Sequence, residues 1–182
     1  MLIRLADCPT KPWKNGQGRT RELVVFPDGA GMDEFDWRVS IAEVDSAAPF
    51  SRFPGIDRCI VLLDGAGFTM RFDDGHSHAL TTPLEAFEFA GEASVSVALS
   101  DGPTRDFNLM LRRGRIRGNV HCWHSAGDYA LDAHDALLYC VSGQITFDDK
   151  TLNAGDSWLN QSTVQVRLHH GAKALVVKLE TA

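Results

Sequence analysis

Residues Asp57 to Leu99 read DRCIVLLDGAGFTMRFDDGHSHALTTPLEAFEFAGEASVSVAL. Apolar runs in this stretch alternate with glycine turns and one polar tip, a pattern that predicts strand, tight turn, strand, loop, strand, turn and strand. A second version, ALLYCVSGQITFDDKTLNAGDSWLNQSTVQVRLHHGAKALVVKL, spans Ala136 to Leu179. Both versions place a glycine after an apolar run, Gly65 and Gly143, and both contain a later Val-x-Val-x-Leu strand. We interpret them as one β-unit that occurs twice.

The segments that flank the first version alternate between apolar and polar residues, as strands do. Strands are expected over Thr20 to Phe26, Asp36 to Val44 and Asp106 to Leu111. In the second of these, one face carries Trp37, Val39 and Ile41, and the other carries Arg38, Ser40 and Ala42. In the third, one side carries Asp106, Asn108 and Met110. Each of these two strands therefore has its polar side chains on one side.

The strand pattern also predicts the fold class. No segment keeps a 3.6-residue apolar period, so little helix is expected. Short strands with turn signals at close spacing are typical of a sandwich or a barrel. Glycine hairpins and the Ala154-Gly155-Asp156 corner favour the jelly-roll type, of which cupins are an example. We expect an all-β bicupin, with a cupin-like unit over 1–112 and a degenerate cupin-like unit over 113–182. The first unit includes an irregular Pro/Gly-rich arm, Pro9–Gly18.

Composition argues against several classes of protein. The net charge of −6 is opposite in sign to that of most nucleic-acid binders, so no nucleic-acid partner is expected. No window approaches the ~20 apolar residues of a membrane span, and the N-terminal MLIRLADCP lacks the apolar core of a signal peptide. The cysteines form no C-x-x-C pair, and Cys59 and Cys140 lie inside apolar strands. This usage indicates reduced thiols in a cytoplasmic protein without a membrane partner.

A metal site is not expected either. The chain resembles the cupin pattern, in which Fe, Mn, Ni or Zn is held by a His-x-His, a Glu before the glycine turn and a later His. Counted from the glycine turns, these positions fall at Arg52, Pro54, Arg58 and Val97, and in the second unit at Ala130, Asp132, Ala136 and Val166. None is a histidine, and a cationic arginine cannot ligate a metal, so we expect no metal and no cofactor. The segment His76-Ser77-His78 reads as an exposed loop tip.

Arg58 stands at the start of a core strand, where a metal-binding cupin has its glutamate ligand. A guanidinium in an apolar interior needs a carboxylate or water as a partner. The partner is either a bound carboxylate, which guanidinium groups bind in bidentate fashion, or an internal carboxylate. The internal candidates are Glu22, Asp57 and Asp106. Arg38, on the polar face of its strand, has the same two interpretations.

Five blocks of the first unit carry a more specific signature. They are Pro12–Glu22 (PWKNGQGRTRE), Phe35–Val44 (FDWRVSIAEV), Pro49–Arg58 (PFSRFPGIDR), Leu62–Gly65 (LLDG) and Asp106–Met110 (DFNLM). Together they resemble the HutD/Ves family of bacterial bicupins over most of Leu2 to Arg113, whereas the second half is similar only to the general cupin pattern. One departure is Gln17, which stands where the family has the middle glycine of Trp-Lys-Asn-Gly-Gly-Gly.

The resemblance implies a cytoplasmic protein associated with histidine utilisation, which modulates that pathway by binding a carboxylate-bearing intermediate such as urocanate, formiminoglutamate or formylglutamate. It implies a ligand site in the first unit made of Trp13, Lys14, Asn15, Thr20, Glu22, Arg38, Ser40, Phe50, Arg58, Asp106 and Asn108. A few convergent polar groups in an apolar lining are what a small ligand needs. The alternative interpretation of the arm is a structural cover of the barrel mouth, with Trp13 as its plug.

Two other functions stay open. A cupin-type enzyme, an isomerase or a hydrolase, could act on a related small acid, with Glu22 and Asp106 as a general acid–base pair. Alternatively, the degenerate second unit, with the apolar strands ALLYCV and ALVVKL, is a dimer surface. A homodimer is therefore the partner expected besides the small carboxylate metabolite.

Overall fold

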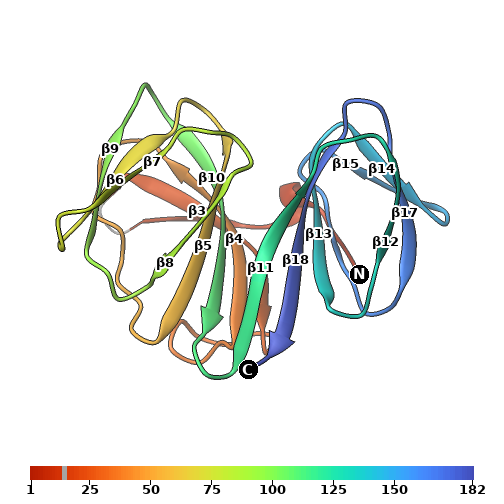
Figure 1. The fold of residues 1–182 in the computed structure, drawn as a ribbon, viewed down its shortest axis with the longest axis horizontal. Helices are drawn as coiled ribbons and strands as arrows, with labels where there is room; N and C mark the ends of the chain where they lie inside the picture. The colour runs from red at the N-terminus through yellow and green to blue at the C-terminus, as the bar shows by residue number, and fades with distance from the viewer. Residues whose placement is uncertain (14–15) are drawn as a thin grey trace. The chain divides into compact units, whose positions relative to one another are not determined.

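The computed structural model describes residues 1–13 and 16–182. Within this part of the chain, the regular structure consists of β-strands and one 3-10 turn, η1 (Leu5–Asp7), and includes no α-helix. Figure 1 shows this arrangement of strands. The expected all-β class with little helix is confirmed. No helix in the described residues is long and apolar enough to cross a membrane.

The chain divides into two compact units. The first consists of Pro9–Ile116 with Ala182, and the second of Met1–Cys8 with Arg117–Thr181. The N-terminal residues belong to the second unit because β1 (Leu2–Ile3) pairs antiparallel with β16 (Ser157–Leu159). This differs from the expected boundary at residue 112, which grouped the N-terminal residues with the neighbouring arm. Long-range strand pairing, which the local sequence pattern does not reveal, is the reason for the difference.

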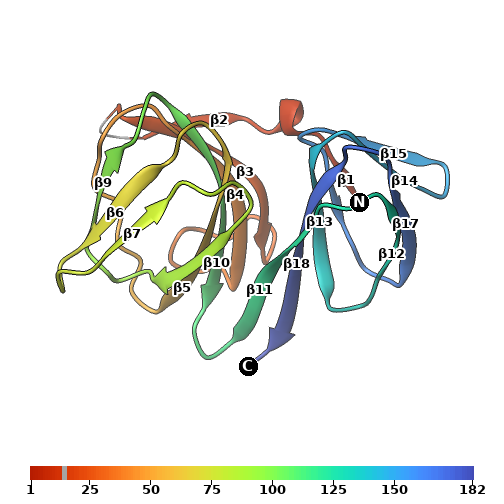
Figure 2. The ribbon, with the colours of Figure 1, turned by 45° about the horizontal axis from the view of Figure 1, so that its top comes forward.

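The first unit is a sandwich of two antiparallel sheets. Its larger sheet contains, in spatial order, β2 (Thr10–Pro12), β3 (Gly18–Phe26), β4 (Trp37–Val44), β10 (Thr104–Arg112), β5 (Ile56–Asp64) and β8 (Ala86–Ala90). Its smaller sheet contains β7 (Ser77–Leu80), β6 (Phe68–Phe72) and β9 (Val95–Leu99). Figures 1 and 2 show the two sheets as separate layers. An apolar cluster of Val44, Ile60, Leu62, Phe68, Met70, Phe72, Leu80, Val95 and Val97 joins them.

Strand register lines up side chains on the three central strands of the larger sheet. Met110 of β10 is paired with Arg38 of β4 on one side and with Arg58 of β5 on the other. Asn108 is paired in the same way with Ser40 and Ile60, and Asp106 with Ala42 and Leu62. Because side chains alternate between the two faces of a sheet, all nine of these residues share one face. The alternation expected for β4 and β10 is therefore confirmed.

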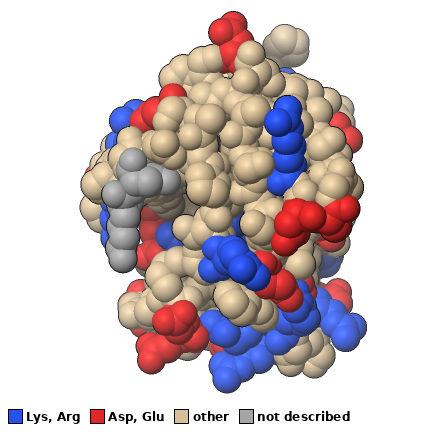
Figure 3. Space-filling view, turned by 90° about the vertical axis from the view of Figure 1, so that its left-hand side faces the viewer, with Lys and Arg blue, Asp and Glu red and all other residues tan. Residues whose placement is uncertain are grey.

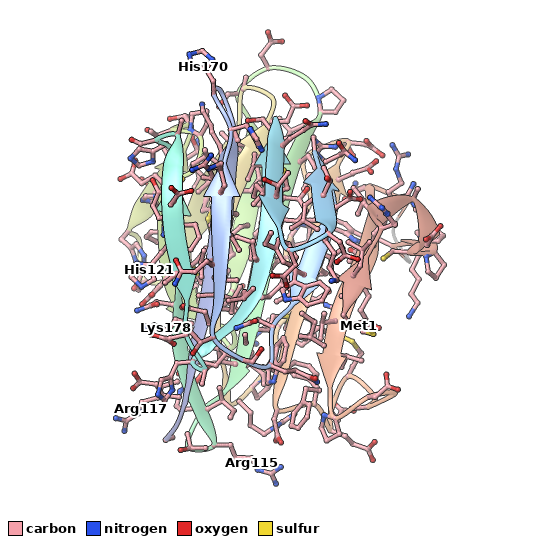
Figure 4. All side chains as sticks on the ribbon, turned by 90° about the vertical axis from the view of Figure 1, so that its right-hand side faces the viewer. Met1, Arg115, Arg117, His121, His170 and Lys178 are labelled. Atoms are coloured by element: carbon pink, nitrogen blue, oxygen red, sulfur yellow. The ribbon has the colours of Figure 1, made fainter. Side chains whose placement is uncertain are left out.

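The second unit repeats the two-sheet design. Its larger sheet has the order β1, β16, β13 (Asp135–Ser142), β18 (Lys173–Thr181) and β11 (Ile116–Trp123). Its smaller sheet has the order β12 (Gly127–Leu131), β17 (Val164–Leu168), β14 (Gln144–Phe147) and β15 (Lys150–Asn153). In Figure 4, Met1 and His121 lie at opposite edges of the larger sheet, as this order requires. A core of Leu131, Leu138, Cys140, Ile145, Phe147, Leu152, Val166, Leu168, Ala172, Ala174 and Val176 joins its sheets.

The glycine after the first apolar run makes a turn that no other residue fits. Gly65 has a φ of +92°, and a Cβ at this position would lie 2.5 Å from the Pro103 carbonyl oxygen. Gly143, its counterpart in the second unit, has a φ of +70°, and its Cβ would lie 2.7 Å from Ala172 Cα. The repeated glycine therefore marks a turn against which another segment packs at backbone distance.

We predict that Gly65→Ala destabilises the protein by about 2–4 kcal/mol, because it combines a left-handed φ with overlap against the Pro103 backbone. Gly75→Ala is the matched control, since Gly75 has a φ of +91° but no atom within 4 Å of the added Cβ. The control should lose only about 1–2 kcal/mol, the strain of the backbone alone. Urea unfolding of both variants gives the comparison. Equal losses would show that the close approach to Pro103 is not a constraint.

Candidate functional site

The first unit contains a cavity of about 510 Å³. This volume is within the usual range for sites that bind small molecules. Its lining combines residues from the arm, from β3, from the segments that precede β4 and β5, and from one face of β4, β5 and β10. They are Pro12, Trp13, Thr20, Met32, Arg38, Ser40, Ala42, Pro49, Phe50, Ser51, Phe53, Arg58, Ile60, Asp106, Asn108 and Met110.

Most of the residues expected in a ligand site come together here. The cavity is lined by Trp13, Thr20, Arg38, Ser40, Phe50, Arg58, Asp106 and Asn108. Glu22 is not among the lining residues but contacts one of them, Arg38. Lys14 and Asn15 lie outside the described residues. The structure thus brings together side chains that are up to 95 positions apart in the sequence, from Trp13 to Asn108.

Arg38 has an internal carboxylate partner. Its Nε donates a hydrogen bond to Glu22 Oε2 at 2.6 Å, and its Nη1 lies 3.4 Å from Ser40 Oγ. Lys11 Nζ also lies 3.9 Å from Glu22 Oε1, so this carboxylate is shared between two cations. Of the two interpretations of Arg38, the structure shows the internal ion pair. Glu22, the expected partner of Asp106 in a general acid–base pair, is therefore engaged in an ion pair with Arg38 instead.

Arg58 differs from Arg38 in that no carboxylate within 4 Å pairs with it in the described part of the chain. Glu22 is paired with Arg38, and Asp57 is paired with Arg113 at 2.6 Å. Arg58 is 6% exposed, and its Nε is buried without a hydrogen-bond partner. Asp106 acts on it only through the longer-range charge interaction. On the surface, by comparison, Figure 3 shows charged side chains of both signs next to one another.

Aromatic rings replace the missing carboxylate. The Arg58 Cζ atom lies 5.2 Å from the ring centroid of Phe50, 5.6 Å from that of Phe53 and 4.8 Å from that of Phe89. Each contact is a cation–π interaction worth about 0.5–2 kcal/mol. Burial, together with the charge of Arg38, lowers the pKa of Arg58 to about 10. The group therefore stays cationic at neutral pH in a position where its charge is not neutralised by a contacting anion.

Asp106 is fully buried beside this cation. Its Oδ1 accepts a 3.4 Å hydrogen bond from Thr104 Oγ1, whereas its Oδ2 has no partner. Burial raises the pKa of Asp106 to about 7, although the Thr104 hydroxyl and the charge of Arg58 act in the opposite direction. Asn108, which is 7% exposed, likewise has a buried Oδ1 without a partner. The interior thus presents one unpaired donor on Arg58 and unpaired acceptors on Asp106 and Asn108.

Trp13 holds the arm against the first long strand. Its Nε1 donates a 2.8 Å hydrogen bond to Thr20 Oγ1, and a Cβ on Gly18 would lie only 3.0 Å from its ring. The backbone of Gln17 accepts a hydrogen bond from Asp45 N at 3.2 Å. Both interpretations of Trp13 are compatible with this geometry, because the indole is fixed to the strand and also lines the cavity.

Several lining residues were missed by the sequence analysis as site residues. Met110 lies between the two arginines in the register, with its Sδ 3.7 Å from Arg38 Nη1. Its alternation with Asn108 along β10 was the signal that could have identified it. Met32, in contrast, comes from the turn between β3 and β4, and no periodicity predicted that it would reach the cavity. Phe89 of β8, which contacts Arg58 without lining the cavity, was also not identified.

The histidine pair His76 and His78 is not simply a loop tip. His78 belongs to β7, where its ring stacks on that of Phe87 at 3.6 Å between centroids. His76 stacks on Phe72 at 4.0 Å. The expectation of an exposed loop was wrong for His78, because its ring covers an aromatic edge of the core. Among the described residues, no group of three or more His, Cys, Asp or Glu side chains is placed to hold a metal ion.

Two antiparallel sandwich units with a shared hairpin pattern define a bicupin. The cupin 2 conserved barrel domain protein from Leptotrichia buccalis has the same fold, with a TM-score of 0.61 and 11% identity over 99% of this chain and 96% of that chain. The structure of HutD from Pseudomonas fluorescens SBW25 is more similar, with a TM-score of 0.84 and 28% identity over 100% of this chain and 98% of that chain. The expected bicupin fold is confirmed.

The HutD family model matches residues 5–177. An uncharacterized 21.2 kDa protein in the hutC 3' region of Pseudomonas putida is 38% identical over 144 residues, which are 79% of this chain and 75% of that protein. Protein Ves of Cronobacter sakazakii is 35% identical over 162 residues, 88% of this chain and 87% of that protein. The chain belongs to the HutD family, and the resemblance drawn from the five sequence blocks is confirmed.

The raised pKa of Asp106 predicts a pH-dependent stability. Between its ordinary value of 3.8 and about 7, the folded protein keeps a proton that the unfolded chain has lost. The free energy of unfolding should therefore fall by roughly 1 kcal/mol per pH unit as the pH rises through this window, and level off above it. Asp106→Asn removes this contribution, so the variant should gain stability relative to wild type between pH 5 and pH 7.

Denaturant unfolding at pH 5, 6, 7 and 8 measures the difference between wild type and Asp106→Asn. Asp64→Asn, which removes an exposed carboxylate from β5, controls for the loss of one negative charge. If the difference between wild type and Asp106→Asn is the same at every pH, burial does not hold the proton on Asp106.

Proposed function

We propose that this protein binds a small carboxylate-bearing metabolite in the cavity of the first unit, with the ligand carboxylate on Arg58. The observation that carries the proposal is that Arg58 is a buried cation without a contacting carboxylate in the described residues. An isolated buried charge is costly, and a carboxylate that enters the cavity would relieve that cost. The planar guanidinium also suits a carboxylate, which it can bind through two parallel hydrogen bonds.

The remaining lining supports a ligand with an apolar or planar body. Phe50 and Phe53 supply apolar surface next to the guanidinium, and Ile60 and Met110 supply more within the cavity. Aromatic rings at this position also limit the access of water, which strengthens a charged hydrogen bond inside the cavity. The combination of an apolar lining with a few convergent polar groups is typical of small-molecule sites.

The pathway assignment rests on the relatives. One relative is named for its position in the hutC 3' region, and a solved relative is named HutD. We therefore place this protein in histidine utilisation, with a modulating role, and propose urocanate, formiminoglutamate or formylglutamate as the ligand. Each of these acids carries a carboxylate for Arg58. Cys59 and Cys140 are buried inside β5 and β13, and this use of cysteine supports the proposed cytoplasmic location.

The test is thermal and calorimetric binding of urocanate, formiminoglutamate and formylglutamate to wild type and to Arg58→Met. A bound acid at a hundredfold excess over Kd should stabilise wild type by about 2.7 kcal/mol. Arg58→Met should raise Kd by about 30-fold or more, because it removes a charged hydrogen-bond donor from the ligand. Arg52→Met, at an exposed arginine that does not line the cavity, is the matched control and should bind as wild type does.

The unliganded Arg58→Met variant gives a second readout. Replacing a buried, unpaired cation with an apolar side chain of similar length should leave the stability unchanged or raise it by ~1–4 kcal/mol. A marked loss of stability would mean that the cation–π contacts, rather than a ligand, are the reason for Arg58. Failure of all three acids to shift the melting temperature of wild type would contradict the proposed ligand class.

An enzymatic function is the second candidate, and the position of Asp106 favours it. A carboxyl group with a pKa of about 7 inside a cavity is suited to general acid–base catalysis. Glu22, the expected second member of the pair, is bound to Arg38 instead. NMR spectra of each acid incubated with the protein would reveal isomerisation or hydrolysis, and metal analysis of the purified protein would test for a stoichiometric transition metal. If wild type converts one of these acids and Asp106→Asn does not, the result would favour the enzymatic function.

A further inference from the structure

The unpaired polar atoms of the cavity indicate which hydrogen-bonding groups a ligand must carry. Three residues that line the cavity are each more than nine-tenths buried and have a polar atom without a hydrogen-bond partner. These atoms are Arg58 Nε, Asp106 Oδ2 and Asn108 Oδ1. Nε is a donor and needs an acceptor, which the ligand carboxylate of the proposed function provides. The other two atoms are acceptors and need donors. A carboxylate alone therefore satisfies only one of the three.

The strand register places these atoms in sequence along the cavity. Arg58 is paired with Met110, and Asn108 and Asp106 follow on the same face of β10 at steps of two residues. Successive residues on one face of a strand are ~6.6–6.8 Å apart. A ligand whose carboxylate lies on the long side chain of Arg58 therefore extends past Asn108 toward Asp106. Its groups beyond the carboxylate meet acceptors rather than donors.

Thr104 defines which oxygen of Asp106 is available. Its hydroxyl donates to Oδ1 at 3.4 Å, and this leaves Oδ2 as the oxygen without a partner. Burial raises the pKa of Asp106 to about 7, so above that pH the carboxyl is ionised and Oδ2 is an acceptor. No other described side chain donates a hydrogen bond to Oδ2. The donor must come from the ligand or from water.

We propose that the ligand carries, in addition to its carboxylate, an N–H group that donates a hydrogen bond to Asp106, so that Asp106 selects nitrogen-bearing acids over the same acids without the N–H. This inference rests on the proposed function, because it assumes that the carboxylate lies on Arg58. The ligand class is thus an acid with an amide, amine, imine or heterocyclic N–H. Asp106 is the specificity-determining residue, and Asn108 offers a second acceptor beside it.

The test uses matched pairs of acids that differ only in the N–H. Urocanate is compared with its two ring N-methyl isomers, and formylglutamate with N-formyl-N-methylglutamate, by calorimetry at pH 8, above the pKa of about 7. The N–H member should bind about tenfold or more tightly than its N-methyl partner, because methylation leaves a buried acceptor unpaired. Asp106→Asn should remove this preference, since Thr104 holds Oδ1 and the amide then presents a donor where Oδ2 was.

Asp64→Asn is the control and should keep the full preference, because it removes a carboxylate outside the cavity. The readout also separates this inference from the proposed function. If the acids bind through Arg58 but methylation changes Kd less than twofold, or if Asp106→Asn leaves the preference intact, the N–H inference is wrong and the proposed function stands. If none of the acids binds wild type, the proposed function is wrong and this inference falls with it.

Discussion

The contact between the Arg58 guanidinium and three phenylalanine rings is the interaction on which the cavity depends. It keeps a cation inside a sandwich where most neighbouring side chains are apolar. Cation–π attraction offsets part of the free-energy cost of removing the guanidinium from water, but it provides no hydrogen-bond acceptor for the buried Nε. The charge is therefore tolerated without being neutralised by contact. That imbalance distinguishes Arg58 from Arg38, whose Nε is hydrogen-bonded to Glu22.

The inner face of the larger sheet contributes both to the core and to the cavity. Val44, Ile60 and Leu62 join the apolar cluster that connects the two sheets of the first unit. The same face carries Arg38, Arg58, Asp106 and Asn108, and these line the cavity together with Ile60. One set of strands thus supplies both the core and the site. Rigid strands hold the polar groups at set spacings, which is the condition for selective recognition of a small molecule.

The second unit shows what the same pattern does without the buried cation. The position that corresponds to Arg58 is Ala136, and the following inward side chains, Leu138 and Cys140, belong to an apolar core. A cluster of leucine, isoleucine, valine, alanine and aromatic side chains packs between the two sheets of the second unit. The two units therefore share a strand arrangement but differ in the side chains between their sheets. The chemistry proposed for this protein belongs to the first.

Much of this arrangement could be predicted from local sequence. The period of two along β4 and β10 placed Arg38, Ser40, Asp106 and Asn108 on the correct faces, because side-chain alternation is a property of any strand. The glycine turns at Gly65 and Gly143 were equally visible, since only glycine adopts their φ without strain. The pairing of β1 with β16 and the contribution of Met32 to the cavity were not predictable in this way, because both depend on contacts across long stretches of chain.

Which charged groups pair with one another could not be predicted from the sequence. Local pattern placed Arg58 in a core strand and left Glu22, Asp57, Asp106 and a ligand as equal candidates to neutralise it. Which carboxylate pairs with which arginine depends on side-chain distances, and these are known only in the folded protein: Glu22 pairs with Arg38, and Asp57 pairs with Arg113. The alternating strands, the repeated unit and the buried position of Arg58 thus follow from residue order, whereas the unpaired state of Arg58 and Asp106 follows from tertiary packing, because a charge is neutralised by proximity in space.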